Sequence, residues 1–112
     1  KYLWSKYKLN KSYESTKDLL DKYDLNAFIG LTRGPAWKIN YDGGDYVAMN
    51  DSPQFGSGGY AAHNGMPHIT IPYFEINKFP VGISIIGDRW TDKTIIGYAS
   101  AIEKSRYNLD TQ

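Results

Sequence analysis

The clearest candidate nucleophile in this chain is Ser57. It stands among glycines in the run Gly56-Ser57-Gly58-Gly59. A serine in such a run can attack a carbonyl when its backbone is strained and a base lies within hydrogen-bond reach. The run lacks the G-x-S-x-G spacing of a nucleophile elbow, so we assign no catalytic role to Ser57. Its glycines can let backbone N–H groups approach an anion; contact with a substrate and a plain loop before a helix are the other interpretations.

A metal site is the second kind of chemistry to weigh. His63 and His68 are five residues apart, whereas a zinc-binding pair on a helix is spaced i, i+4. Asp42, Asp45 and Asp51 lie in a glycine-containing loop, but their order departs from a calcium-binding loop, and turn formation accounts for them better. The absence of cysteine excludes thiolate ligands and disulfides. We therefore expect no metal and no other cofactor.

The third candidate is an aromatic side chain in the loop-rich middle of the chain. Trp37 follows Gly34-Pro35-Ala36 and precedes Asp45. An aromatic ring in such a loop can line a substrate cleft or can plug the edge of the core, and both remain open. No phosphate-binding loop or dinucleotide-binding fingerprint occurs in the sequence.

Composition narrows the class of protein and its partners. The 112 residues fit one small domain, with 41% hydrophobic and 22% charged residues. The net charge is +1 and the Lys-rich start is diluted by acids, so we expect neither nucleic acid nor a membrane as partner. No apolar run approaches the roughly 20 residues of a membrane helix, and no signal peptide is present. The compartment stays unknown, with the cytoplasm as default.

These candidates need elements to position them, and the first are a helix and a strand. Ser12 is a suitable N-cap for a helix over residues 12–23, whose apolar residues recur at helical spacing. Residues 27–31 form an apolar run with the length of a buried strand. Residues 32–59 have no clear period, and a loop of that length inside a domain is usually functional.

The following segment predicts a short helix and a pair of strands. A helix over 60–65 should end at its glycine. Residues 68–72 and 81–87 have the pattern of strands, and the short link 73–79 predicts an antiparallel pair. Gly82 inside the second strand implies a bulge or a closely approaching backbone.

A terminal helix completes the pattern. Thr91 is a good N-cap, and Ile95, Ala99 and Ile102 form an apolar stripe. We expect residues 108–112 to be a frayed tail. The fold class is therefore α/β, with a few strands and two main helices. Apolar strands such as 81–86 need cover on both faces, and we expect part of that cover to lie outside these residues.

Two blocks of sequence carry a more specific pattern. Residues 65–72 read Gly-Met-Pro-His-Ile-Thr-Ile-Pro, and residues 79–87 read Phe-Pro-Val-Gly-Ile-Ser-Ile-Ile-Gly. They resemble the C-terminal signature of the amidase-signature family, of the type aGyP-x-itvP followed by glPvGisfiG and a helix. Upstream, Gly34-Pro35-Ala36-Trp37-Lys38 resembles a subgroup that includes peptide amidases. The similarity spans residues 12–106.

The resemblance implies a fold and an activity. The 112 residues would be the C-terminal part of a single amidase domain, a fragment of a mixed β-sheet covered by helices. The family hydrolyses carboxylic amides to an acid and ammonia with a Lys and two serines in a Gly-Ser-Ser-Gly-Gly-Ser-type core. That core belongs to the N-terminal portion of family members and is absent here. The chain would therefore be inactive alone, and no catalytic role passes to Ser57.

The resemblance also implies partners. They are the N-terminal part of the same protein and a small-molecule or peptide amide substrate, while the isolated chain is expected to be marginally stable or to self-associate. Trp37, Asp45 and Ser57 are predicted to form part of the substrate cleft wall. Two alternatives remain open: a non-catalytic scaffold or subunit with an amidase-like fold, and part of an amidotransferase. Thr32-Arg33, where family members commonly have Pro-Thr, leaves the substrate class undetermined.

Overall fold

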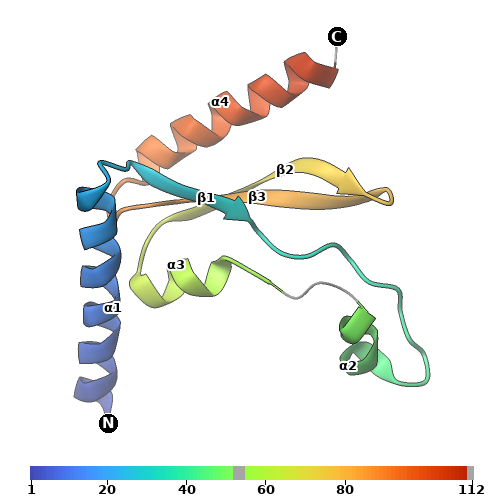
Figure 1. Ribbon diagram of the computed structural model, residues 1–112, viewed down its shortest axis with the longest axis horizontal. Coiled ribbons are helices and arrows are strands. Elements are labelled where there is room, and N and C mark those ends of the chain that lie inside the picture. The colour runs from blue at the N-terminus through green and yellow to red at the C-terminus, as the bar shows by residue number, and fades with distance from the viewer. Residues whose placement is uncertain (52–54, 111–112) are drawn as a thin grey trace.

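In the computed structural model, three strands form one sheet with helices on both of its faces (Figure 1). The structure describes residues 1–51 and 55–110. The elements, in chain order, are α1 Tyr2–Lys22, β1 Ala27–Leu31, α2 Gly44–Ala48, the 3-10 turn η1 Met49–Asp51, α3 Gly58–Asn64, β2 His68–Ile76, β3 Phe79–Gly87 and α4 Asp92–Asp110. This arrangement confirms the predicted α/β class.

The sheet has the order β1-β3-β2, and both strand pairs are antiparallel. Strand β1 has the bounds that the apolar run predicts. The β2–β3 hairpin is tighter than expected, because β2 continues to Ile76 and pairs it with Phe79. The turn consists of Asn77 and Lys78, whose φ angles are 52° and 67°. Positive φ at both central residues is the mark of a type I′ turn, which suits the twist of a two-residue hairpin.

Neighbouring groups approach Gly82 closely, as its place inside the strand predicts. The register of β2 shifts between Pro72 and Phe74, which leaves one extra residue near Gly82. A Cβ atom at position 82 would lie 2.7 Å from the Thr70 methyl group and 3.0 Å from the Thr32 hydroxyl. Strand β2 is therefore bulged opposite Gly82, and only glycine fits at position 82 without a shift of its neighbours.

Alternation of side chains along β3 produces two separate cores, one on each face of the sheet. The first core packs under α4 and consists of Ile71, Ile85, Ile95 and Ala99. The second core lies on the other face, beneath α1 and α3, and consists of Leu20, Ala61, Met66 and Ile86. Ile85 and Ile86, which are neighbours in sequence, thus pack into different cores on opposite faces of the sheet.

Helix α1 begins at Tyr2, so the prediction of a start at Ser12 is wrong. Ser12 lies inside the helix, and its hydroxyl donates a 2.7 Å hydrogen bond to Asn64 Oδ1 in α3. The first eleven residues lack an apolar stripe, yet they contain no Gly or Pro to interrupt a helix. Local pairs add support, among them Trp4 stacked on Tyr7 with ring centroids 5.6 Å apart.

The remaining boundaries follow the sequence more closely. Helix α3 ends at Gly65, whose φ of 62° is the left-handed conformation expected there. Helix α2 and the turn η1 lie inside segment 32–59, where the sequence shows no period; residues 52–54 of it lie outside the described residues. Helix α4 includes residues 108–110 of the tail, and residues 111–112 lie outside the described residues. Fraying of 108–112 stays a prediction.

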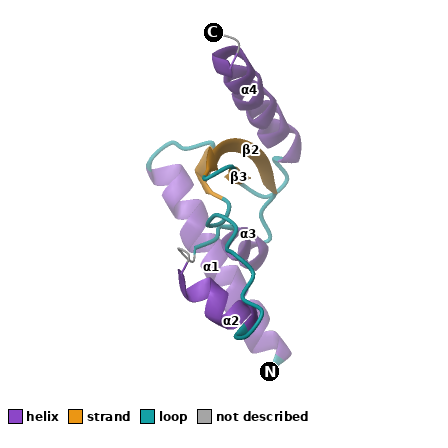
Figure 2. Ribbon diagram, turned by 90° about the vertical axis from the view of Figure 1, so that its right-hand side faces the viewer, coloured by secondary structure: helices purple, strands orange, loops and turns teal. Residues whose placement is uncertain are grey.

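The chain exposes more surface than a compact domain of equal mass. Its radius of gyration is 17.1 Å, whereas a compact domain of about 100 residues has about 13 Å. Its accessible surface is 8485 Å², and size scaling gives about 6,200 Å², an excess of about 2,300 Å². Helices α1 and α4 project from the sheet in opposite directions (Figure 2). None of the described helices has the length and apolar character to cross a membrane.

Candidate functional site

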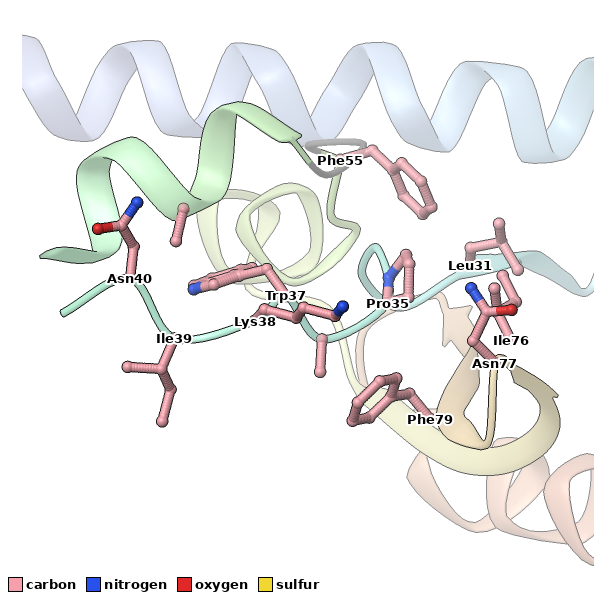
Figure 3. Close-up of a pocket in the computed structure, with 12 residues that line it drawn as sticks. Leu31, Pro35, Trp37, Lys38, Ile39, Asn40, Phe55, Ile76, Asn77 and Phe79 are labelled. Carbon is pink, nitrogen blue, oxygen red and sulfur yellow. The ribbon is translucent and has the colours of Figure 1, made fainter. Parts of the chain in front are cut away.

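A cavity of about 890 Å³ lies between segment 35–40, helix α2 and the tip of the β2–β3 hairpin (Figure 3). Small-molecule sites usually have about 300–1,000 Å³. Its lining is mostly apolar and consists of Leu31, Pro35, Ala36, Trp37, Lys38, Ile39, Asn40, Ala48, Phe55, Ile76, Asn77 and Phe79. Several of the large apolar side chains are exposed to solvent, including Ile39, Phe55 and Phe79. Among the described residues, the cavity is thus a mostly apolar hollow with walls that are partly exposed to solvent.

Trp37 is the most constrained aromatic ring of the lining. Its indole N–H donates a long hydrogen bond of 3.4 Å to Asp45 Oδ1 at the start of α2. The Arg33 guanidinium stacks over the ring, with its Cζ atom 5.4 Å from the ring centroid. One polar contact and one stacking contact therefore orient the ring from different sides.

Local turn chemistry places Asp45 within reach of Trp37. The Asn40 side-chain oxygen accepts hydrogen bonds from the backbone N–H groups of Asp42 and Gly43, at 3.1 and 2.7 Å. This side-chain turn reverses the chain just before α2. Gly44 then adopts a φ of 65°, a conformation that favours glycine. The turn gives Asp42, Gly43 and Gly44 a structural role at the start of α2.

The three sequence-predicted site residues divide into two groups. Trp37 lines the cavity and Asp45 supports it from α2. Ser57 does not line the cavity, because its hydroxyl donates a 2.8 Å hydrogen bond to the Leu31 carbonyl and its N–H bonds to the Thr32 carbonyl at 3.2 Å. Ser57 therefore fastens the loop to the end of β1. Contact of any of the three with a substrate stays a prediction.

Phe55 and Phe79 are cavity residues that sequence reasoning missed. Figure 3 shows their side chains around segment 35–40, from a loop and from the hairpin respectively. Neither stands in a motif with chemical meaning. Exposed aromatic residues beside Pro-Gly-rich segments were the available signal, but the register of the hairpin decides that Phe79 reaches this cavity.

A second polar cluster crosses the face of the sheet opposite α4. His68 Nε2 lies 2.6 Å from Ser84 Oγ, and the Ser84 hydroxyl donates to Thr32 Oγ1 at 2.8 Å. A serine and a histidine at this distance resemble an activated nucleophile. However, Ser84 is only 1% exposed, and its hydroxyl is hydrogen-bonded to both His68 and Thr32 inside the sheet. The cluster is therefore a structural hydrogen-bond network.

The other histidine has a separate partner. His63 Nδ1 lies 2.6 Å from the Gly59 carbonyl inside α3. Within residues 1–51 and 55–110, no group of three or more metal-ligating side chains comes together. Both histidines thus have local hydrogen-bonding roles in the described part of the chain.

The main electrostatic cluster lies away from the cavity, between α1 and the end of β3. Asp88 accepts hydrogen bonds from the Tyr13 hydroxyl and the Arg89 N–H, and Lys17 Nζ lies 3.4 Å from it. Partial burial raises the pKa of Asp88, but these donors outweigh it and the pKa lies below its ordinary value. The hydrogen bond to Asp88, followed by burial, raises the pKa of Tyr13. The cluster anchors α1 to the sheet.

Comparison with known proteins gives a partial match. The chain is 44% identical over 45 residues to a glutamyl-tRNA(Gln) amidotransferase subunit from Thermotoga maritima. The match covers 39% of this chain and 10% of the Thermotoga protein. The Thermotoga protein is a member of the amidase-signature family. The similarity supports a relation to this family at a coarse level. No protein-family model and no solved structure matches the chain.

Proposed function

We propose that this chain is the C-terminal part of an amide hydrolase that converts a carboxylic amide and water to an acid and ammonia. The observation that carries the proposal is the 44% identity over 45 residues to an amidase-signature protein. The motif blocks 65–72 and 79–87 support it through their resemblance to the amidase-signature pattern. Most of their residues lie in the β2–β3 hairpin.

The chain would act by support and positioning rather than by bond cleavage. Its sequence contains no Gly-Ser-Ser-Gly-Gly-Ser-type core, and the close pair of Ser84 and His68 is held within the sheet, with Ser84 buried. The nucleophile and the groups that stabilise the oxyanion would come from the N-terminal part of the same protein. This chain would supply the sheet, helix α4 and a cleft wall around Trp37 and Asp45. Holding an amide in place contributes to rate by removing its translational freedom beforehand.

The excess surface supports the presence of such a covering part. Stable protein contacts bury about 800 Å² on each partner, and the excess here is about 2,300 Å². The N-terminal half of α1 contributes Tyr2, Leu3 and Trp4, each more than half exposed. A docked N-terminal portion would remove such apolar side chains from water.

An amidotransferase is the second candidate, because the matching protein carries that name. Such an enzyme passes the released ammonia to an acyl acceptor instead of releasing it into solution. It would need a glutaminase-like site and partner subunits. The two candidates differ in the fate of ammonia, so an assay of ammonia release distinguishes them.

The test is ammonia release by the product of the complete gene, with the 112-residue chain alone as control. A hydrolase releases ammonia from simple carboxamides such as benzamide and N-acetyl-amino-acid amides, and the chain alone releases none. Release restricted to glutamine and stimulated by an acyl acceptor would favour the amidotransferase. If the complete gene encodes no serine-rich core and its product binds no amide, both candidates are overturned and the scaffold alternative is left.

A further inference from the structure

The chemistry of the cavity lining restricts what the cavity can hold. Eight of the lining side chains are apolar: Leu31, Pro35, Ala36, Ile39, Ala48, Phe55, Ile76 and Phe79. A cavity of about 890 Å³ with such walls is stabilised by an apolar group that displaces water from them. Binding of a small polar group alone would leave most of these walls wet.

The charges around the cavity are not balanced. Lys38 lines it, and no Asp or Glu is among the lining residues that the structure describes. Arg33 stands on the Trp37 ring and lines an adjoining hollow of about 340 Å³. The neighbouring carboxylate, Asp45, accepts the indole N–H. A positively charged ligand would therefore meet Lys38 and Arg33, while the neighbouring Asp45 carboxylate already accepts the indole N–H.

The Trp37 ring is the aromatic surface against which a ligand in the cavity would pack. The ring belongs to the lining of both hollows, and its contacts with Asp45 and Arg33 favour the orientation in which it lines them. A preoriented aromatic ring contacts a flat or branched apolar group at little cost in conformational freedom. Phe55 and Phe79 add two further apolar side chains around segment 35–40 (Figure 3).

We infer that this cavity binds an uncharged apolar side chain of the amide substrate, of the aromatic or branched aliphatic kind, against Trp37. The inference rests on the proposed amide hydrolase function and deepens it. It assigns substrate preference to this chain, while bond cleavage belongs to the rest of the enzyme.

The test compares four neutral-backbone amides on the complete enzyme: the N-acetyl amides of phenylalanine, leucine, glycine and lysine. The expected KM for the phenylalanine and leucine compounds is at least about tenfold lower than for glycine, since burial of such side chains has that effect. The lysine compound is expected to be the poorest. Equilibrium binding of the phenylalanine compound, measured by calorimetry, gives a readout that does not depend on turnover.

Variants locate the effect. Trp37→Ala should raise KM for the phenylalanine amide about tenfold and raise KM for the glycine amide much less, because glycine has no side chain to contact the ring. Trp37→Phe keeps an aromatic ring and should restore most of the preference, which also covers the case of an alanine variant that does not fold. Trp90→Phe is the matched control, because Trp90 is 94% exposed and lies outside the cavity lining.

Each outcome decides between the proposals. Hydrolysis without preference among the four amides, or equal loss on all of them in both Trp37 variants, would overturn the inference and leave the hydrolase proposal in place. Trp37-dependent binding of the phenylalanine compound without ammonia release would overturn the hydrolase and keep the apolar site. Unfolding of the complete enzyme on Trp37→Ala, together with no binding of the amides to the parent enzyme, would show that the ring packs against protein instead and would overturn the inference.

Discussion

The Tyr13 hydroxyl donates a 2.6 Å hydrogen bond to the Asp88 carboxylate and so joins the middle of α1 to the end of β3. Because the acceptor is ionised and half-buried, we expect Tyr13→Phe to lower the free energy of unfolding by about 1–2 kcal/mol. Urea unfolding followed by circular dichroism measures the change. Tyr41→Phe is the matched control, since Tyr41 is 91% exposed. Equal stability of the two variants would contradict an anchoring role.

The same contact should make stability depend on pH. The pKa of Asp88 lies below its ordinary value in the folded chain. Its contribution is therefore complete above the unfolded pKa of about 4 and is lost as the pH falls through the folded pKa. We expect the wild-type chain to lose more unfolding free energy between pH 6 and pH 3 than Asp88→Asn does, measured by urea unfolding. Parallel pH profiles would rule out this linkage.

At alkaline pH the partner residue should produce the opposite trend. The pKa of Tyr13 is raised by its bond to Asp88, so its contribution is present below the unfolded value of about 10 and declines as the pH rises through the folded pKa. Spectrophotometric titration of the tyrosines should show one group that ionises later in the wild type than in Asp88→Asn. A titration curve unchanged by Asp88→Asn would count against this contact.

Two glycines of the sheet should respond in opposite ways to alanine. A Cβ atom at Gly82 would lie 2.7 Å from the Thr70 methyl group, whereas a Cβ at Gly30 would have no heavy atom within 4 Å. Gly82→Ala should destabilise the chain by about 1–3 kcal/mol through overpacking. Gly30→Ala should leave stability unchanged or raise it by about 0.5 kcal/mol, since glycine is a poor strand residue. Chemical unfolding of both variants checks the pair, and similar effects would contradict the described packing.

The large exposed surface predicts the behaviour of the isolated chain. Apolar side chains such as Leu3 and Ile29 are more than half exposed, and a chain that hides them by association gains stability with concentration. We expect the thermal midpoint to rise over a hundredfold range of concentration, or else a broad, marginal transition. Sedimentation velocity identifies the species. A sharp melt of a monomer at every concentration would show that the expectation is wrong.

The sequence predicted those elements whose signals are local. The apolar run 27–31 and the left-handed Gly65 needed no tertiary information, and both agree with the structure. The start of α1 could not be predicted in the same way, because residues 1–11 carry no periodic apolar face and little of the chain packs on them. The extent of β2 depends on pairing with β3 through a two-residue turn, which no residue of the link 73–79 specifies strongly.

For the candidate site, sequence reasoning named Trp37 and Asp45, but it missed Phe55 and Phe79 and the way in which these residues come together. Trp37 and Asp45 come together because Asn40 turns the chain between them. Ser57 is in a promising glycine run, yet its hydroxyl bonds to the Leu31 carbonyl. The hydrogen bond of Ser57 joins residues 26 apart in sequence, so no short-range pattern contains it. The Asn40 turn is a local signal, but its effect on Trp37 and Asp45 is visible only in the fold.

The strand order β1-β3-β2 has a consequence for how the chain folds during its synthesis. Strand β1 is synthesised before the hairpin whose outer edge it must join, and its pairing of Ala27 with Gly87 closes a long loop. Long loops close slowly, while a hairpin forms from neighbouring residues. The β2–β3 hairpin is therefore the template, and pulsed hydrogen exchange during refolding should protect its amides before those of β1. During synthesis, β1 is complete before its pairing partner β3 has been made. Its apolar residues, among them Ile29, are then unpaired and are a segment that a chaperone could protect.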